Sequence, residues 1–417
     1  MASSRRPERP VPTERRARGP SREKPLVHVD IPVAAPADDG CWREIVEQVH
    51  RVHWRIRSVE AIGASRKTLR VGYAGRAVPA AVVDAVATLG TEIRRSHERV
   101  PVEVVFSHGD RSRPGEPDAI RGLLEGGALR LTREGSLEVS GVFRRLMERL
   151  ERYLQRYAAA LGAEHYEFPS LLPVDVAARC GIFDKQPQNV HVVASVKYTM
   201  NGARRGLRAL VKRTADGDWS SRLARPRLIL SPAVCYHYWR GARERAHGTA
   251  LDVGTATGRC YRFEAPGLLG PERLREFTMW ELFAVGEPHR TEALRLRCLE
   301  FVKDVLVGLD LVGRVATASD PFFADVYART RMFQVNMRLK HELQLWLPHR
   351  GHDVAVASVN DHRDFFTDAF GMTAGGRSLH SCCMAFGLER IALAVVSQHG
   401  LDARRWPPAI ASLMDGP

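Results

Sequence analysis

The first residues suited to chemistry lie in Gly258-Arg-Cys-Tyr-Arg-Phe-Glu264, which is followed after a loop by Arg273 and Phe277. Side chains alternate between the two faces of a strand, so Arg262 and Glu264 are predicted to share a face. Arg262 can fork onto an α-phosphate, Arg273 can meet the outer phosphates, and the Phe277 ring can stack on adenine. An antiparallel hairpin with a surface ion pair would contain the same residues, so this segment alone leaves both interpretations open.

A second segment suited to nucleotide binding is Met384-Ala-Phe-Gly-Leu-Glu-Arg390. Gly387 stands where a predicted strand turns into a helix, and a glycine there lets a ligand approach the backbone closely. Arg390 follows three residues later and can cover the face of a purine by a cation–π contact. A strand–helix junction with a surface arginine explains the same residues, so this segment is also ambiguous when taken alone.

Candidate ligands for a metal ion are spread over three further segments. Cys235 and Glu281 each stand in a different segment, whereas Cys382 and Cys383 are adjacent. Two thiolates and a carboxylate can hold Zn²⁺ with its fourth position open, as a ligand-binding zinc site requires. The spacing is not a CxxC pattern, and a free buried cysteine is commonly just a small hydrophobic residue, so both interpretations remain. That plain role is expected for Cys180, Cys260 and Cys298.

The composition limits the class of protein without choosing a function. The 417 residues, 44% of them hydrophobic, suffice for one large core and a smaller domain. We find no run of 18 apolar residues and no pattern of a secretory leader, and the seven cysteines suit reduced thiols, so a cytoplasmic protein with no membrane partner is expected. About +5 of the +14 net charge lies in residues 1–25, and the excess would suit nucleic acid or an acidic protein.

Three regions are predicted along the chain. Residues 1–40 are rich in Arg, Pro, Ser and Ala and are predicted to be a disordered basic tail. Residues 41–117 are predicted to form a small α/β unit of unknown role, and residues 118–417 a larger unit. In the small unit we expect helices over residues 41–60 and 80–96, strands over Thr68–Tyr73 and residues 100–106, and a linker over residues 108–117.

The larger unit is expected to be an α+β domain. Residues 142–161 carry the apolar stripe of an amphipathic helix, residues 388–398 are predicted as the last helix, and residues 128–140 suggest a hairpin. Further strands are expected at Leu228–Leu230 and at residues 258–264, 277–285 and 355–359. Hairpin-like pairs at long separations favour a mixed, mainly antiparallel sheet.

In this order, with Pro173 after a long predicted helix, the segments match the three signatures of class II aminoacyl-tRNA synthetases. Within that superfamily the chain resembles the zinc-dependent seryl-tRNA synthetases of methanogens and, more closely, the amino acid:carrier-protein ligases, which look like such synthetases without their tRNA-binding domain. The resemblance covers about 290 residues and rests on residues 164–183, 234–237, 258–281, 318–323, 340–343, 357–370, 380–390, 398–400 and 406–407.

The resemblance implies a reaction in two steps. The carboxylate of an amino acid attacks the α-phosphorus of ATP, which gives an aminoacyl adenylate and releases pyrophosphate. The phosphopantetheine thiol of a carrier protein then attacks the adenylate, which gives an aminoacyl thioester and releases AMP. Arginines and Mg²⁺ neutralise the phosphates. The ATP positions fall on Arg262, Glu264, Arg273, Phe277 and Arg390, with Arg262 and Arg390 as the catalytic pair.

The resemblance also implies a zinc ion, small amino-acid substrates and a homodimer. The zinc positions fall on Cys235, Glu281 and Cys383. Cys383 is preferred over Cys382 because it stands four residues before Gly387, the register that the family uses. In the family the open zinc position receives the amino group of the substrate, which suits a neutral amine.

The sequence departs from the family pattern in several places. The family often has a carboxylate for Mg²⁺ where this chain has Ala355, so Glu264 and the phosphates would hold the ion alone, or nucleotide handling is altered. Trp280 replaces an arginine before Glu281 and is expected to reshape the amino-acid pocket. Residues 184–187 replace a more aromatic stretch, and residues 1–107 lie outside the resemblance.

Three other functions compete with a carrier-protein ligase. The first is a seryl-type aminoacyl-tRNA synthetase, against which residues 41–107 are too short and too mixed for a large tRNA-binding domain. The second is a non-catalytic paralogue, suggested by the missing acid at Ala355. The third is transfer of the aminoacyl group to a small amine.

Overall fold

The computed structural model describes residues 25–36, 38–99, 101–112, 115–116, 118–197, 223–242, 251–318, 337–406, 408 and 411–412. Residues 1–24 of the predicted tail, residues 319–323 and Pro407 lie outside these ranges. Within the described ranges, no helix is both long enough and apolar enough to cross a lipid bilayer.

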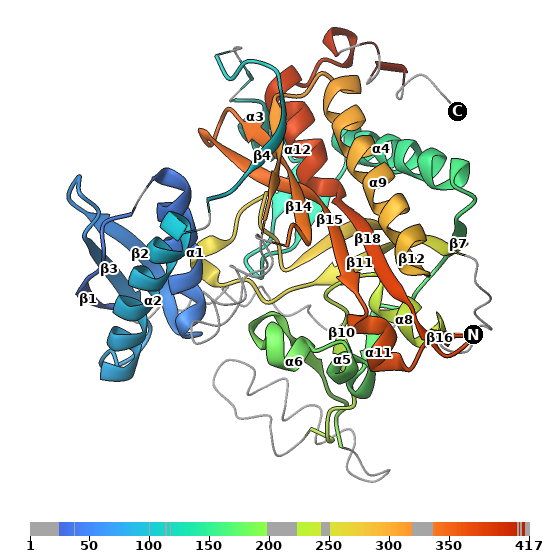
Figure 1. Cartoon of the computed structure of the whole chain (residues 1–417). Helices are drawn as coiled ribbons and strands as arrows, with labels where there is room; N and C mark the ends of the chain where they lie inside the picture. Colours follow the sequence, from blue (N-terminus) through green and yellow to red (C-terminus); the bar gives the residue numbers. More distant parts are fainter. Residues whose placement is uncertain are drawn as a thin grey trace, which may run out of the picture.

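The N-terminal unit is a three-stranded antiparallel sheet in the order β1-β3-β2, packed with helices α1 and α2 (Figure 1). Its elements are β1 (Val27–Pro32), α1 (Asp39–Val52), β2 (Ile56–Ile62), β3 (Thr68–Tyr73) and α2 (Ala80–Arg99). Leu69, Val71 and Tyr73 alternate along β3 and point into a small core with Ile45 and Val49 of α1. The unit therefore has a core of its own.

Two predictions for this unit are corrected by the structure. The prediction of disorder over residues 1–40 is wrong for Val27–Pro32, which forms β1 because its apolar residues alternate and Ile31 is fully buried. The prediction of one helix over residues 41–60 is wrong beyond Val52. The backbone turns to an extended conformation at His53, and Ile56 begins β2.

The larger unit is built on an eight-stranded sheet in the order β4-β13-β14-β15-β18-β12-β11-β7. Neighbouring strands are antiparallel, except that β7 runs parallel to β11. The strands are β4 (Val104–His108), β7 (Glu164–Tyr166), β11 (Asp252–Tyr261), β12 (Glu276–Gly286), β13 (Gly313–Thr317), β14 (Lys340–Leu347), β15 (His352–Arg363) and β18 (His380–Gly387). The predicted α+β class with a mixed, mainly antiparallel sheet is confirmed.

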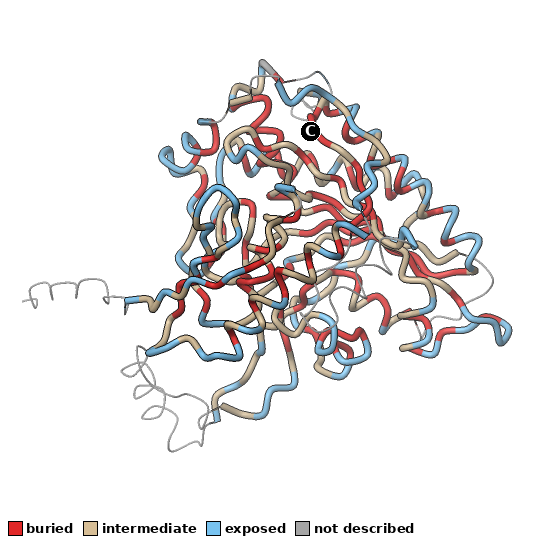
Figure 2. Tube along the Cα trace, turned by 60° about the vertical axis from the view of Figure 1, so that its left-hand side comes forward, coloured by how far each residue is buried: buried red, intermediate tan, exposed pale blue. Residues whose placement is uncertain are grey.

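Helices cover both faces of this sheet, and each face has its own buried core (Figures 1 and 2). One face carries α3 (Ala119–Glu125), α4 (Gly141–Ala160), α9 (Pro288–Gly308), α12 (Leu388–His399) and the hairpin β5 (Leu129–Leu131)–β6 (Leu137–Val139). The other face carries α5 (Val174–Arg179), α6 (Ile182–Lys185), α8 (Tyr236–Ala242), α11 (Phe365–Phe370) and a small sheet, β8 (Leu171–Pro173)-β10 (Leu228–Leu230)-β9 (His191–Val193). A short hairpin, β16 (Thr373–Ala374)–β17 (Arg377–Ser378), lies between α11 and β18 in the chain.

Two boundaries differ from the predictions for the larger unit. The strand predicted at residues 100–106 is β4, which pairs with β13 of the large sheet and does not belong to the small unit. Strand β11 ends at Tyr261, so Arg262 and Glu264 do not lie on a strand, contrary to the prediction. Helices α4 and α12 and strands β3 and β10 form where they are predicted.

A buried glutamine ties the last helix to the sheet. Gln398 of α12 donates from Nε2 to the carbonyl oxygens of Trp346, at 2.8 Å, and Val312, at 3.0 Å. Its Oε1 accepts from the Val312 N–H at 2.7 Å. One side chain thus satisfies three backbone groups at the ends of two strands.

We expect Gln398→Ala to lower the free energy of unfolding by about 2–3 kcal/mol, because it leaves buried backbone groups without partners. Gln155→Ala is the matched control, since the hydrogen bonds of the Gln155 side chain to other described residues are long, at 3.5 Å, and its cost should stay within about 0.5 kcal/mol. Urea denaturation measures both. Equal stability of the two variants would show that Gln398 does not fasten α12.

Candidate functional site

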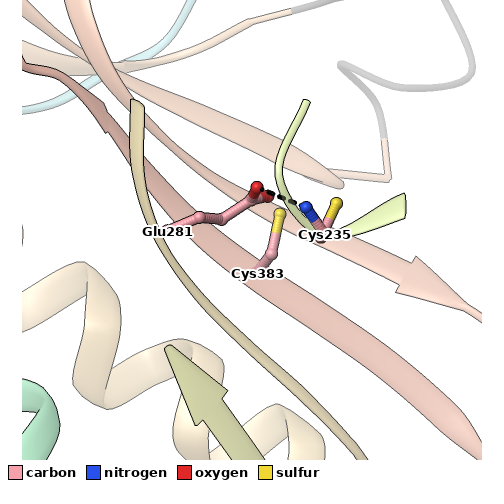
Figure 3. A group of neighbouring side chains, drawn as sticks. All are labelled: Cys235, Glu281 and Cys383. Carbon is pink, nitrogen blue, oxygen red and sulfur yellow. Dashed lines mark hydrogen bonds between the residues drawn. The ribbon is translucent and has the colours of Figure 1, made fainter. Parts of the chain in front are cut away.

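Three potential metal ligands converge in the core between β12, β18 and the start of α8 (Figure 3). Cys235 directly precedes α8, Glu281 lies on β12, and Cys383 lies on β18. Glu281 pairs with Ala385, two residues from Cys383, so both side chains point to the same face of the sheet. The ligand atoms of all three lie within 4.8 Å of one another, and all three residues are buried.

Hydrogen bonds hold these three side chains in place. The Cys235 N–H donates to Glu281 Oε2 at 2.9 Å, which fixes the carboxylate beside the thiol. Asn360 donates from Nδ2 to Cys383 Sγ at 3.3 Å, and His362 Nε2 lies 3.4 Å from the same sulfur. Asn360 and His362 come from β15, which is the other neighbour of β18.

Burial makes it costly to ionise these three groups when no cation is bound. Burial raises the pKa of the Cys235 thiol well above its ordinary value and also raises the pKa of Glu281. The hydrogen bond with Cys235 lowers the pKa of Cys383, but burial and the neighbouring Glu281 together outweigh it, and the net shift is upward. A bound divalent cation would offset the cost of burying these negative charges and would displace the thiol protons. The donor set therefore fits a zinc ion with three protein ligands.

The adjacent cysteine lies in a different environment. Cys382 belongs to the core on the opposite face of the sheet, where Sγ contacts the carbonyl oxygen of Thr291 at 3.6 Å. Trp280 also points to that opposite face, where it packs near Phe386. The expectation that Trp280 reshapes the amino-acid pocket is therefore wrong, because neighbouring residues of a strand face opposite sides.

The predicted nucleotide residues gather near the end of β11. After the strand, the Glu264 N–H donates to the Arg262 carbonyl at 2.8 Å, and this tight turn replaces the predicted strand. The Arg262 guanidinium lies 5.2 Å from the centre of the Phe277 ring, and its Nε donates to the Pro232 carbonyl at 3.0 Å. The terminal nitrogens of Arg262 are then the ones suited to reach a phosphate.

A chain of opposite charges connects Arg273 to this turn. Arg273 Nη1 lies 3.3 Å from Glu264 Oε2, and its Nη2 lies 2.6 Å from Glu47 Oε1 of α1. Burial opposes the ionisation of Glu264, but four nearby arginines, of which Arg273 and Arg51 act most strongly, together outweigh it and lower its pKa. Glu264 is therefore a carboxylate at neutral pH.

Arg390 is held by two backbone groups. Its Nε donates to the Glu272 carbonyl at 2.7 Å, and its Nη1 donates to the Ala355 carbonyl at 2.8 Å. Burial, together with the nearby Arg273, lowers the pKa of Arg390 to about 10, so it stays protonated at neutral pH. These bonds fix the plane of the guanidinium, as stacking on a purine requires. Position 355 offers its backbone oxygen to Arg390 and no carboxylate.

One cleft of about 1960 Å³ joins the two groups of residues. Cys235, Glu281 and Cys383 line it together with Arg262, Glu264, Arg273, Phe277 and Arg390. Glu47 and Arg51 are among the residues of this cleft that sequence reasoning missed. They stand four apart on α1, outside every motif, so no pattern in the sequence connects them with a nucleotide site.

Comparison with known proteins adds sequence relatives. No family model matches the chain. It is 30% identical over 287 residues to amino acid–[acyl-carrier-protein] ligase 1 of Bradyrhizobium diazoefficiens, and this alignment covers 67% of this chain and 85% of that protein. It is 31% identical over 276 residues to ligase 2 of the same organism, over 63% of this chain and 80% of that protein. The type-2 serine–tRNA ligase of Methanopyrus kandleri is 27% identical over 63% of this chain and 53% of that protein.

Solved structures show the same fold. The M. kandleri seryl-tRNA synthetase, in complex with A. aeolicus tRNASec, aligns with a TM-score of 0.67 at 22% identity over 94% of this chain and 78% of that one. The seryl-tRNA synthetase of Pyrococcus horikoshii, complexed with ATP, aligns with a TM-score of 0.53 at 14% identity over 72% and 62%. This is the class II synthetase fold. With the sequence identity to the two Bradyrhizobium enzymes, it follows that the chain belongs to the amino acid–[acyl-carrier-protein] ligase family.

Proposed function

We propose that this protein activates a small amino acid with ATP and transfers the aminoacyl group to the phosphopantetheine thiol of a carrier protein. The observation that carries the proposal is that a dithiol–carboxylate ligand set and a set of arginines line one cleft. The choice of a carrier protein as the acceptor is supported by the relatives named amino acid–[acyl-carrier-protein] ligases. A homodimer, as the resemblance implies, is part of the same proposal.

The amino acid would bind at the ligand set. Cys235, Glu281 and Cys383 would hold zinc, and a bound zinc ion supplies an open position that takes a neutral amine. The hydrogen bond from the Cys235 N–H keeps Glu281 directed at this position, and Asn360 steadies Cys383 from the neighbouring strand. Because these groups lie in a buried core, the amine would be bound away from bulk water.

ATP would bind at the arginine set. Phe277 and Arg390 offer an aromatic ring and a fixed guanidinium for the adenine, and Arg262 offers terminal nitrogens to the α-phosphate. As the substrate carboxylate attacks phosphorus, negative charge grows on the α-phosphate, and Arg262 stabilises it. Arg273 would hold the outer phosphates that leave as pyrophosphate. The reaction needs no nucleophilic side chain, and we assign none.

Mg²⁺ would enter with the nucleotide. Ala355 provides no carboxylate, so Glu264, ionised at neutral pH, and the phosphates would be its ligands. The dependence on Mg²⁺ would then rest on a single protein carboxylate.

A transfer RNA is the alternative acceptor. The alignment with the tRNA-bound M. kandleri enzyme extends over 94% of the chain and therefore reaches beyond the larger unit. The sequence identity to the carrier-protein ligases is higher and covers 85% of the first of them, which favours the carrier protein.

For the metal, we expect about one zinc ion per chain in the wild type and its loss in Cys235→Ala, because two protein ligands bind zinc much more weakly than three. Cys382→Ala is the control and should keep its zinc, since that thiol lies on the other face of the sheet. Elemental analysis of the purified proteins measures both. Full zinc content in Cys235→Ala would contradict the assignment of zinc to Cys235, Glu281 and Cys383.

For activation, Arg262→Ala and Arg390→Ala should each lower amino-acid-dependent pyrophosphate exchange by about 100-fold or more, because each loses a charge aimed at the nucleotide. Arg404→Ala is the control, since Arg404 lies on the surface and pairs with Asp402, and it should exchange like the wild type. Near-normal exchange in both cleft variants would refute adenylation at this cleft.

For transfer, labelled amino acid should appear on a holo-carrier protein and not on tRNA. Added salt should slow the transfer, because carrier proteins are acidic and this chain carries an excess of positive charge. The apo-carrier, which lacks the phosphopantetheine thiol, is the control and should stay unlabelled. Label on tRNA with none on any holo-carrier would favour the alternative acceptor.

A further inference from the structure

Helix α1 of the N-terminal unit lies beside the loop between β11 and β12 (Figure 1). Its residues Glu47 and Arg51 line the cleft where we place the nucleotide. We propose that Arg51 of α1 is a further phosphate-binding residue, which contacts the outer phosphates of ATP beside Arg273. The proposal rests on the ATP site argued above and goes beyond it, because it gives the N-terminal unit a part in that site.

The docking of α1 is close. Turn η3 (Pro266–Leu268), in the loop between β11 and β12, packs against α1 and β2. A side chain at Gly267 would come within 2.2 Å of the Arg57 carbonyl oxygen and 2.5 Å of His50 Nε2. Only a glycine fits there without a shift of backbone. The loop that carries Arg273 is therefore pressed against α1.

An ion pair fastens α1 to the nucleotide loop next to this contact. Glu47 binds Arg273 at 2.6 Å, and Arg51, one helical turn later on the same face of α1, lies 3.8 Å from Glu264. The Arg51 side chain is only 13% exposed. Its long aliphatic stem thus carries the guanidinium into the cleft between the two units.

The balance of charge shows why Arg51 suits a phosphate. The guanidinium groups of Arg51, Arg262, Arg273 and Arg390 interact with the carboxylates of Glu47 and Glu264. Arg262 also interacts with Glu281, which we assign to the zinc site and leave out of this balance. Glu272, which borders the same cleft, is matched by Arg350 at 2.7 Å and leaves this balance unchanged. The group thus has an excess of two positive charges in a poorly solvated place.

An excess of buried positive charge is costly unless an anion binds there. The ion pair between Glu47 and Arg273 is sufficient to dock α1, and Glu264 already has Arg273 as a partner. Arg51 is therefore the cation that docking does not require. The phosphate chain of ATP supplies the missing negative charge, and AMP supplies only the phosphate nearest Arg262.

The test compares binding of MgATP and of AMP to the full-length zinc-loaded protein by calorimetry. Arg51→Met should weaken MgATP by about tenfold or more and leave AMP within about twofold, because only ATP has the outer phosphates. Arg51→Lys should recover part of the loss, since it keeps the charge. Arg94→Met is the matched control, because Arg94 is an exposed arginine of the same unit, paired with Glu98, and it should bind both nucleotides like the wild type.

Three other binding results would overturn the inference, and each has its own meaning. Unchanged MgATP binding in Arg51→Met would mean that Arg51 does not touch the nucleotide. Equal weakening of MgATP and AMP would assign Arg51 a structural role, and tighter MgATP binding would make α1 an obstacle to the nucleotide. If the wild type binds neither nucleotide, the proposed function itself fails, and the control variant Arg94→Met would fail with it.

Discussion

The antiparallel pairing of β12 with β11 and β18 is the constraint on which the site depends. Because side chains alternate along these strands, Glu281 and Cys383 face one core, while Trp280 and Cys382 face the other. A slip of one residue in either strand would exchange the faces and separate the ligands. Helices α9 and α12, packed on the far face and tied at Gln398, help to hold this register.

The same strands set the distance between the two halves of the cleft. Phe277 lies at the start of β12 and Glu281 four residues further along, on the same face of the strand. One rigid element thus joins the positions that we propose for the adenine ring and for the amine. Arg262 leaves β11 at the same end, and Arg390 enters from α12 after β18. Positioning of this kind, on paired strands, suits a reaction whose catalysis is mainly orientation and charge neutralisation.

Local patterns explain most of what could be predicted from the sequence. The apolar stripe of α4 and the alternation of β3 each depend on residues a few positions apart, and both elements form where predicted. The preference for Cys383 over Cys382 is implied by the resemblance, through the family's register with Gly387, and the structure brings Cys383 to Cys235 and Glu281. Two of the failures concern partners distant in sequence. Strand β4 joins the large sheet because β13 lies beside it, and Arg51 reaches Glu264 only through the docking of α1.

The central claim is that one cleft holds the amino group of the substrate at a zinc ion and the phosphate of its adenylate at Arg262. The most direct measurement is a crystal structure with a non-hydrolysable glycyl- or alanyl-adenylate analogue, with anomalous data recorded at the zinc edge. The account predicts an anomalous peak between Cys235, Glu281 and Cys383, with the analogue's amine on the metal and its phosphate mimic against Arg262. The absence of a metal peak there, or an adenosine bound away from Phe277 and Arg390, would contradict it.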